Sequence, residues 1–106
     1  MDQNCIALRL DGNLTLRSIS AHQERLLSAL SQHGLVELDL AGDAQFDLSF
    51  LQLLESARIY AGTAGRVVRL SRAADGSLLD LLDRAGFLSA MTAQDRHFWL
   101  HEGVTA

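Results

Sequence analysis

Apolar and polar residues alternate along three short segments, and such alternation predicts strands that bury one face. The three segments are residues 5–10, 36–40 and 66–70. In the second, Glu37 and Asp39 share the polar face. These patterns predict a sheet with one face against the core and the other toward solvent.

A turn follows the first alternating segment. Asp11-Gly12-Asn13 is a strong turn signal, and residues 14–16 read as a short return strand. The sequence therefore predicts that the fold opens with a β-hairpin.

Helical spacing of apolar residues marks the intervening stretches. Ser20 and Gln23 have the spacing of a capping box, which predicts a first helix that begins at Ser20 and ends before Gly34. A second helix is predicted from about Ser49 to Ala61. A third is predicted to begin near residues 75–77 and to end at Gly86.

The pattern weakens after Leu88. Residues 91–96 fit a helical turn, and residues 97–100 fit a short edge strand or a packed tail. In either form, Phe98, Trp99 and Leu100 are expected to anchor this segment to the body of the fold.

Together the elements predict an α/β fold in two layers, with a mixed sheet of about four strands and helices packed on one face. Opposite charges at Arg9, Glu37 and Asp39, and at Arg66 or Arg69, are expected to be cross-strand neighbours on the open face. The length of 106 residues fits a single domain, with its core at about 5–88 and a tail at 89–106.

Composition narrows the function classes. The net charge is −4, there is no lysine, and the arginines are scattered, which argues against nucleic-acid binding. No apolar run is long enough for a membrane span. Cys5 is the single cysteine, which suits the cytoplasm, and its place in a strand predicts a buried, unreactive thiol.

No catalytic or phosphate-binding motif is present, and no enzyme activity or cofactor is expected. His97 and His101 have an i, i+4 spacing, but they lack a third ligand for zinc, so no metal site is expected. Asp39, Asp43 and Asp47 gather around one loop and could hold a cation or act as an acid–base pair. A solvated acidic rim with a helix cap is the favoured interpretation.

Ser49 lies where the second predicted strand and loop run into a helix. The predicted helix start makes it an N-cap, with Gln52 at the capping-box position. A phosphoryl group on this hydroxyl would lie at a helix N-terminus, where free N–H groups and the helix dipole favour an anion. The added charge beside Asp43 and Asp47 would repel an acidic partner surface. The two interpretations of Ser49 are thus a simple cap and a phosphorylation switch.

The order of these motifs resembles the STAS domain family, which includes bacterial anti-sigma factor antagonists. The resemblance covers about residues 5–88 and includes Leu10-Asp11-Gly12-Asn13-Leu14, the strand at 36–40 and the stretch from Phe46 to Leu54. The family signature at the strand-to-helix junction is Asp-Ser-Ser-Gly, whose second serine is phosphorylated in the antagonists. Asp47 and Ser49 match its first and third positions, whereas Leu48 and Phe50 replace the others.

The resemblance implies a non-enzymatic module that binds a protein in bacterial signalling or chemotaxis. The implied partner is an anti-sigma serine kinase with a histidine-kinase-like ATPase fold, or a signalling complex, and phosphorylation of Ser49 would release it. An exposed Phe50 is expected to anchor the contact. The implied partner-binding residues are Asp43, Asp47, Ser49, Phe50, Gln52 and Arg58.

Two other functions stay open. Within the same fold, the chain could be a constitutive, unphosphorylated subunit, such as the small partner of a lipid-transport ABC ATPase. From another class, it could be a small enzyme or ligand-binding domain that uses the acidic loop. The phosphorylation-regulated interaction module is the leading hypothesis.

Overall fold

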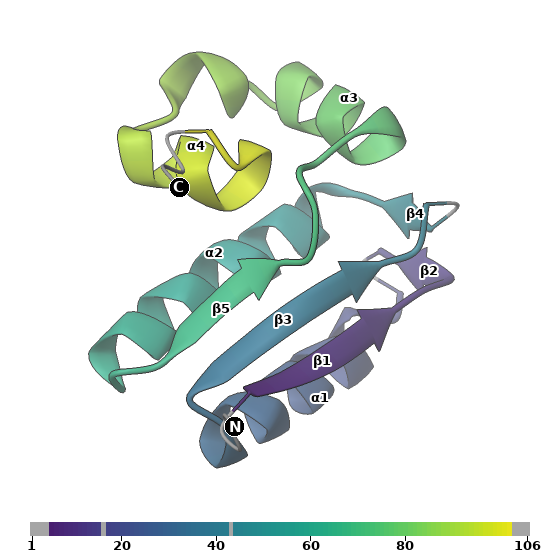
Figure 1. The fold of residues 1–106 in the computed structure, drawn as a ribbon. Helices are drawn as coiled ribbons and strands as arrows, with labels where there is room; N and C mark the ends of the chain where they lie inside the picture. Colours follow the sequence, from purple (N-terminus) through teal and green to yellow (C-terminus); the bar gives the residue numbers. More distant parts are fainter. Residues whose placement is uncertain (1–4, 16, 43, 103–106) are drawn as a thin grey trace.

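The structure is a computed structural model that describes residues 5–102 except residues 16 and 43. A parallel sheet lies against two long helices, and two shorter helices lie beyond the ends of its strands (Figure 1). The elements are β1 (Cys5–Leu10), β2 (Asn13–Leu14), α1 (Ile19–Gln32), β3 (Leu35–Leu40), β4 (Gln45–Phe46), α2 (Leu48–Thr63), β5 (Val67–Leu70), α3 (Gly76–Arg84), the 3-10 turn η1 (Leu88–Ala90) and α4 (Ala93–Leu100).

The main sheet has the strand order β1-β3-β5, and each neighbouring pair is parallel. The long helices α1 and α2 connect these strands and cover the same face of the sheet (Figure 1). The predicted α/β fold, with helices on one face of a short sheet, is confirmed.

The predicted opening hairpin is wrong. The turn does form, with Gly12 at φ +76°, but the chain crosses the end of the sheet instead of returning along β1. Gly12 O accepts a hydrogen bond from Gln45 N at 2.8 Å, and β2 then pairs with β4. This second, two-stranded sheet is also parallel, so no mixed sheet forms among the described residues.

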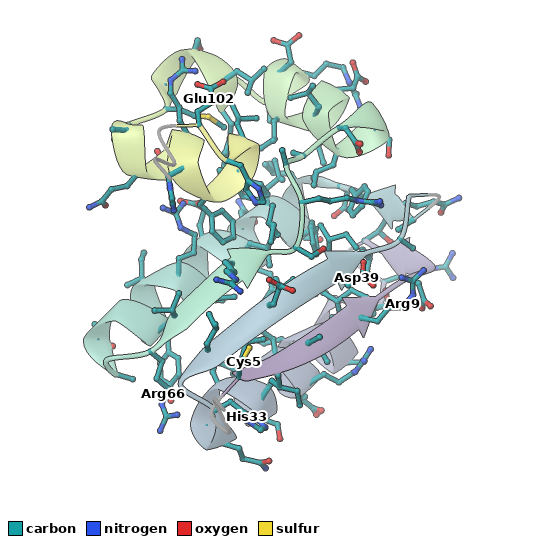
Figure 2. The ribbon with its side chains drawn as sticks, viewed as in Figure 1. Cys5, Arg9, His33, Asp39, Arg66 and Glu102 are labelled. Atoms are coloured by element: carbon teal, nitrogen blue, oxygen red, sulfur yellow. The ribbon has the colours of Figure 1, made fainter. Side chains whose placement is uncertain are left out.

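The alternating pattern of the strands is visible in their burial. Val36, Leu38 and Leu40 of β3 are buried against the helices, while the residues between them stay partly exposed. Arg9 pairs with Asp39 across β1 and β3 at 2.8 Å, as Figure 2 shows on the open face. Arg69 pairs with Glu37 across β3 and β5 at 2.9 Å. The predicted cross-strand charge pairs are therefore confirmed, and each adds ~0–1 kcal/mol because it is exposed.

The structure corrects two local predictions. Cys5 is exposed, because it shares the open face of β1 with Ala7 and Arg9. The first helix begins at Ile19 with Ser18 at the N-cap, so the capping box predicted at Ser20 does not form.

The segment after Leu88 is helical and belongs to the core. Residues 97–100 lie in α4, so the predicted edge strand is wrong. Thr92 caps this helix, since its side chain accepts from Asp95 N and the Asp95 carboxylate accepts from Thr92 N. Phe98 and Trp99 are buried in the same core as the strands, which confirms that this segment is anchored.

Candidate functional site

The start of α2 is organised by Asp47. Asp47 is the N-cap residue in extended conformation, and its Oδ1 accepts a hydrogen bond from Ser49 N at 3.0 Å. The Ser49 hydroxyl donates to the same oxygen. An N-cap aspartate satisfies a free N–H of the first turn and places negative charge at the positive end of the helix. Ser49 is therefore the second helical residue, and the prediction that it is the N-cap is wrong.

Ser49 is partly exposed at this helix end. Leu48 directly precedes it in the helix and is 48% exposed. The serine that the signature singles out thus has an apolar residue beside it at the surface and a carboxylate hydrogen-bonded to it.

Phe50 points the opposite way. It is fully buried, and its ring centroid lies 5.1 Å from that of Phe46. Phe50 shares the inward face of α2 with Leu53, Leu54 and Ala57, at i+3, i+4 and i+7. The expectation that Phe50 is an exposed anchor is wrong, because the helix register turns it into the core.

On the outward face of α2, sequence reasoning named Gln52 but missed Leu48 and Ile59. Leu48, Gln52 and Ile59 are exposed, and Ile59 is the most open of them at 70%. Their spacing of four and seven residues puts them on one side of the helix. The helical register that buries Phe50 also predicts this face, so the signal was present in the sequence.

Arg58 lies apart from Ser49. Nine residues of helix separate them by about 13.5 Å and half a turn. The Arg58 side chain is 19% exposed and contacts Glu55 at 2.8 Å and Asp95 at 3.1 Å. Its guanidinium also lies 4.5 Å from the centroid of the Phe98 ring. Arg58 therefore joins α2 to α4, and the structure does not bring it together with Ser49.

The same junction shifts the ionisation of Asp95. Burial alone would raise the pKa of this carboxyl group, but hydrogen bonds from Thr92 and Arg58 favour its charged form. The net effect of burial and these hydrogen bonds is that the pKa of Asp95 lies below its ordinary value. Glu55 completes the cluster, since it also accepts a hydrogen bond from Trp99 Nε1 at 3.2 Å.

The remaining candidate residues do not form a second site. Asp43 lies outside the described residues, and Asp39 is engaged with Arg9. His101 ends α4 in the left-handed region at φ +57°, with Nε2 3.1 Å from Leu70 O. Within residues 5–102, leaving out 16 and 43, there is no group of three or more metal-ligating side chains. In that same part of the chain no helix is both long and apolar enough to cross a bilayer.

The fold and the start of α2 define a class: a small α/β module whose candidate site is a strand–loop–helix junction. The family model described as "Mlab, STAS domain" matches residues 1–92. The chain belongs to the STAS domain family. Domains of this family are protein-interaction modules of the anti-sigma-factor-antagonist kind and are generally non-enzymatic. Searches of curated proteins and of solved structures found no match.

Proposed function

We propose that this chain is a non-enzymatic, cytoplasmic protein-binding module that docks through the start and outward face of α2, and that phosphorylation of Ser49 controls the docking. The single observation that carries the proposal is the position of the Ser49 hydroxyl, partly exposed at the second residue of α2 and next to exposed Leu48. The partner class implied by the family is a serine kinase with an ATPase fold of the histidine-kinase type, or a signalling complex.

The outward face of α2 supplies the docking surface. Leu48 and Ile59 expose apolar area at the two ends of the face, and Gln52 lies between them. A helix that presents apolar residues at such spacing suits insertion into the groove of a partner. Leu48 takes the anchoring role expected of Phe50, because it is the large apolar residue that is exposed beside the serine.

Phosphorylation would change this surface through charge. A phosphoryl group adds about −1.5 to −2 charge at neutral pH. The helix N-terminus favours that charge, whereas the Asp47 carboxylate, which is hydrogen-bonded to the same hydroxyl, opposes it. The modified serine would break its bond to Asp47 and present a doubly charged group next to Leu48. An apolar or acidic partner surface would then be disfavoured.

A constitutive subunit is the second candidate, and the Asp47–Ser49 pair favours it. Both the backbone N–H and the hydroxyl of Ser49 are bound to Asp47, so the serine has a complete structural role without any modification. In this case, as in the small partner of a lipid-transport ABC ATPase, docking through α2 would not depend on phosphate.

One experiment separates the two candidates. The tagged chain is recovered from its source cells, and phosphate on it is mapped by mass spectrometry. The co-purified partner is then identified. Its affinity is measured for the wild type and for the variants Ser49→Ala, Ser49→Asp and Leu48→Asp. The switch predicts phosphate on Ser49 and at least tenfold weaker binding by Ser49→Asp, with Ser49→Ala close to wild type. A constitutive subunit predicts no phosphate and equal binding by both serine variants. If Leu48→Asp binds as wild type, the partner does not dock on this face and the proposal fails.

A further inference from the structure

β5 is the last strand of the main sheet, and no described strand pairs with its outer edge (Figure 1). Val67 N donates to Gly34 O at 2.9 Å, and Ser71 N donates to Leu38 O at 2.8 Å. In a parallel ladder these alternate residues turn their backbone groups toward β3. Val68 and Leu70, between them, must turn theirs away from the sheet.

The outward direction is confirmed at Leu70. Its carbonyl oxygen lies 3.1 Å from Nε2 of His101, the residue that follows α4. The backbone groups of Val68 have no comparable partner among the described residues. A strand edge with unpaired N–H and C=O groups is a template for an added strand.

A groove runs along this edge. Its volume is about 750 Å³, and its walls are β5, the second half of α2 and α4. On the side of α2 the wall includes Ala61, with its single methyl group, and Gly62, which has no side chain, so there is room next to the strand. On the open face of the sheet Val67 is 53% exposed. The groove therefore offers backbone groups, space and an apolar contact together.

Arginines outnumber acids among the residues that line the groove. Arg58, Arg66 and Arg69 line it, and Glu37 is the one acid among the described residues that do so, although the whole chain carries −4. Arg69 is paired with Glu37, and Arg58 with Glu55 and Asp95. Arg66, at the start of β5 (Figure 2), has no ion-pair partner among the described residues. The unpaired charge of Arg66 favours an acidic occupant at this end of the groove.

The opposite edge of the sheet lacks these features. On β1 the Arg9 carbonyl is already bound by Arg25 Nη2 at 3.0 Å. Arg9 itself is balanced by Asp11 and Asp39.

We propose that the β5 edge is a second docking site, which binds an extended acidic segment of a partner protein as an added strand. The backbone of Val68 and the N–H of Leu70 would form the ladder, and acidic side chains of the segment would lie near Arg66, just before β5, and near Arg69 on the open face of the sheet. Ser49 does not line this groove, so the site acts independently of phosphorylation at the start of α2.

The test uses the full chain and a defined probe. The probe is a capped, fluorescent peptide of alternating Glu and Val, and the control peptide has Lys in place of Glu. A third peptide carries N-methyl groups on alternate residues, which removes the donors of one edge. We expect the Glu peptide to bind at least tenfold more tightly than either control. Amide exchange at Val68 should slow at least tenfold on binding.

Variants then locate the site. Arg66→Glu should weaken binding of the Glu peptide at least tenfold, with an unchanged circular dichroism spectrum. The control is Arg84→Glu on α3, which removes an exposed arginine outside the groove and should stay within twofold of wild type.

Two outcomes would overturn the proposal. The first is equal binding of the Glu and Lys peptides, or unchanged exchange at Val68 in the bound state. The second is a dimer in sedimentation whose Val68 amide is already protected without peptide, because a second copy of the chain would then occupy the edge.

Discussion

At the scale of single residues, the structure at the start of α2 depends on a carboxylate and a serine two positions apart. Ser49 resembles a cap in the sequence because it precedes an apolar stripe, but Asp47 forms the cap and holds the serine through two hydrogen bonds. Asp and Ser are about equally good caps, so residue type alone does not choose between them. Asp47, and not Ser49, is the cap because the helix register that buries Phe50 in the core starts the helix at Leu48.

Removal of the cap should be measurable. We expect Asp47→Ala to lower the free energy of unfolding by about 1 kcal/mol, because a helix N–H loses its acceptor. Asp47→Asn should keep most of this stability, and urea unfolding monitored by circular dichroism gives both values. An Asp47→Ala protein as stable as wild type would show that the cap contributes nothing.

The neighbouring apolar residues should separate stability from binding. Phe50→Ala should lower the free energy of unfolding by about 3–5 kcal/mol, because it leaves a cavity in the core. Leu48→Ala should change it by less than about 0.5 kcal/mol, since the side chain is half exposed. Denaturant titrations provide the measurement, and a larger loss for Leu48→Ala than for Phe50→Ala would contradict the burial described above.

At the scale of elements, the sequence predicts some parts of the fold and not others. The strands at 36–40 and 66–70 and the three longer helices follow from local periodicity. The pairing of β2 with β4 does not, because it depends on where the chain travels after Gly12 and not on the turn itself. At residues 92–95, by contrast, a capping-box spacing was available, and it marks α4 as a helix.

The junction of α2 and α4 should respond to acid. Because the folded-state pKa of Asp95 is lowered, its ionisation stabilises the fold above the unfolded pKa of about 3.9, and this contribution is lost as the pH falls through the folded value. The difference in unfolding free energy between wild type and Asp95→Asn should therefore be constant from about pH 7 to 5 and shrink below about pH 4.

Urea titrations at each pH measure this difference. Asp80→Asn is the matched control, because Asp80 forms an exposed i, i+4 pair with Arg84 and should show a smaller effect. A difference for Asp95→Asn that grows as the pH falls would contradict the assigned sign.

At the scale of the whole molecule, the family match ends at residue 92, while the core does not. Phe98 and Trp99 are buried among residues from the strands and from α2 and α3. We expect a chain that ends at residue 92 to lose most of its stability. Each large aromatic is worth about 3–5 kcal/mol, against a total of about 5–15 kcal/mol for a domain of this kind.

Thermal unfolding followed by circular dichroism gives the result, and Trp99→Phe in the full chain is the control that keeps the packing. A sharp transition of the truncated chain near the wild-type temperature would show that α4 is dispensable.

Binding of a small-molecule ligand would also change the stability of the whole molecule. If the acidic loop served an enzyme or a small-molecule site, a specific ligand at 100 times its Kd would stabilise the fold by about 2.7 kcal/mol. We expect no shift of the unfolding temperature with nucleotides, phosphate or divalent metals. A reproducible rise on the order of 10 °C with one of them would favour that function instead.

The burial of Trp99 also gives a way to follow folding. The chain has one tryptophan, and it lies on α4, which follows every described strand in the sequence. Its side chain is fully buried in the core, and its indole N–H donates to Glu55 on α2. The indole must therefore leave water when α4 packs against the rest of the fold. Its fluorescence should report the docking of this helix without any added label.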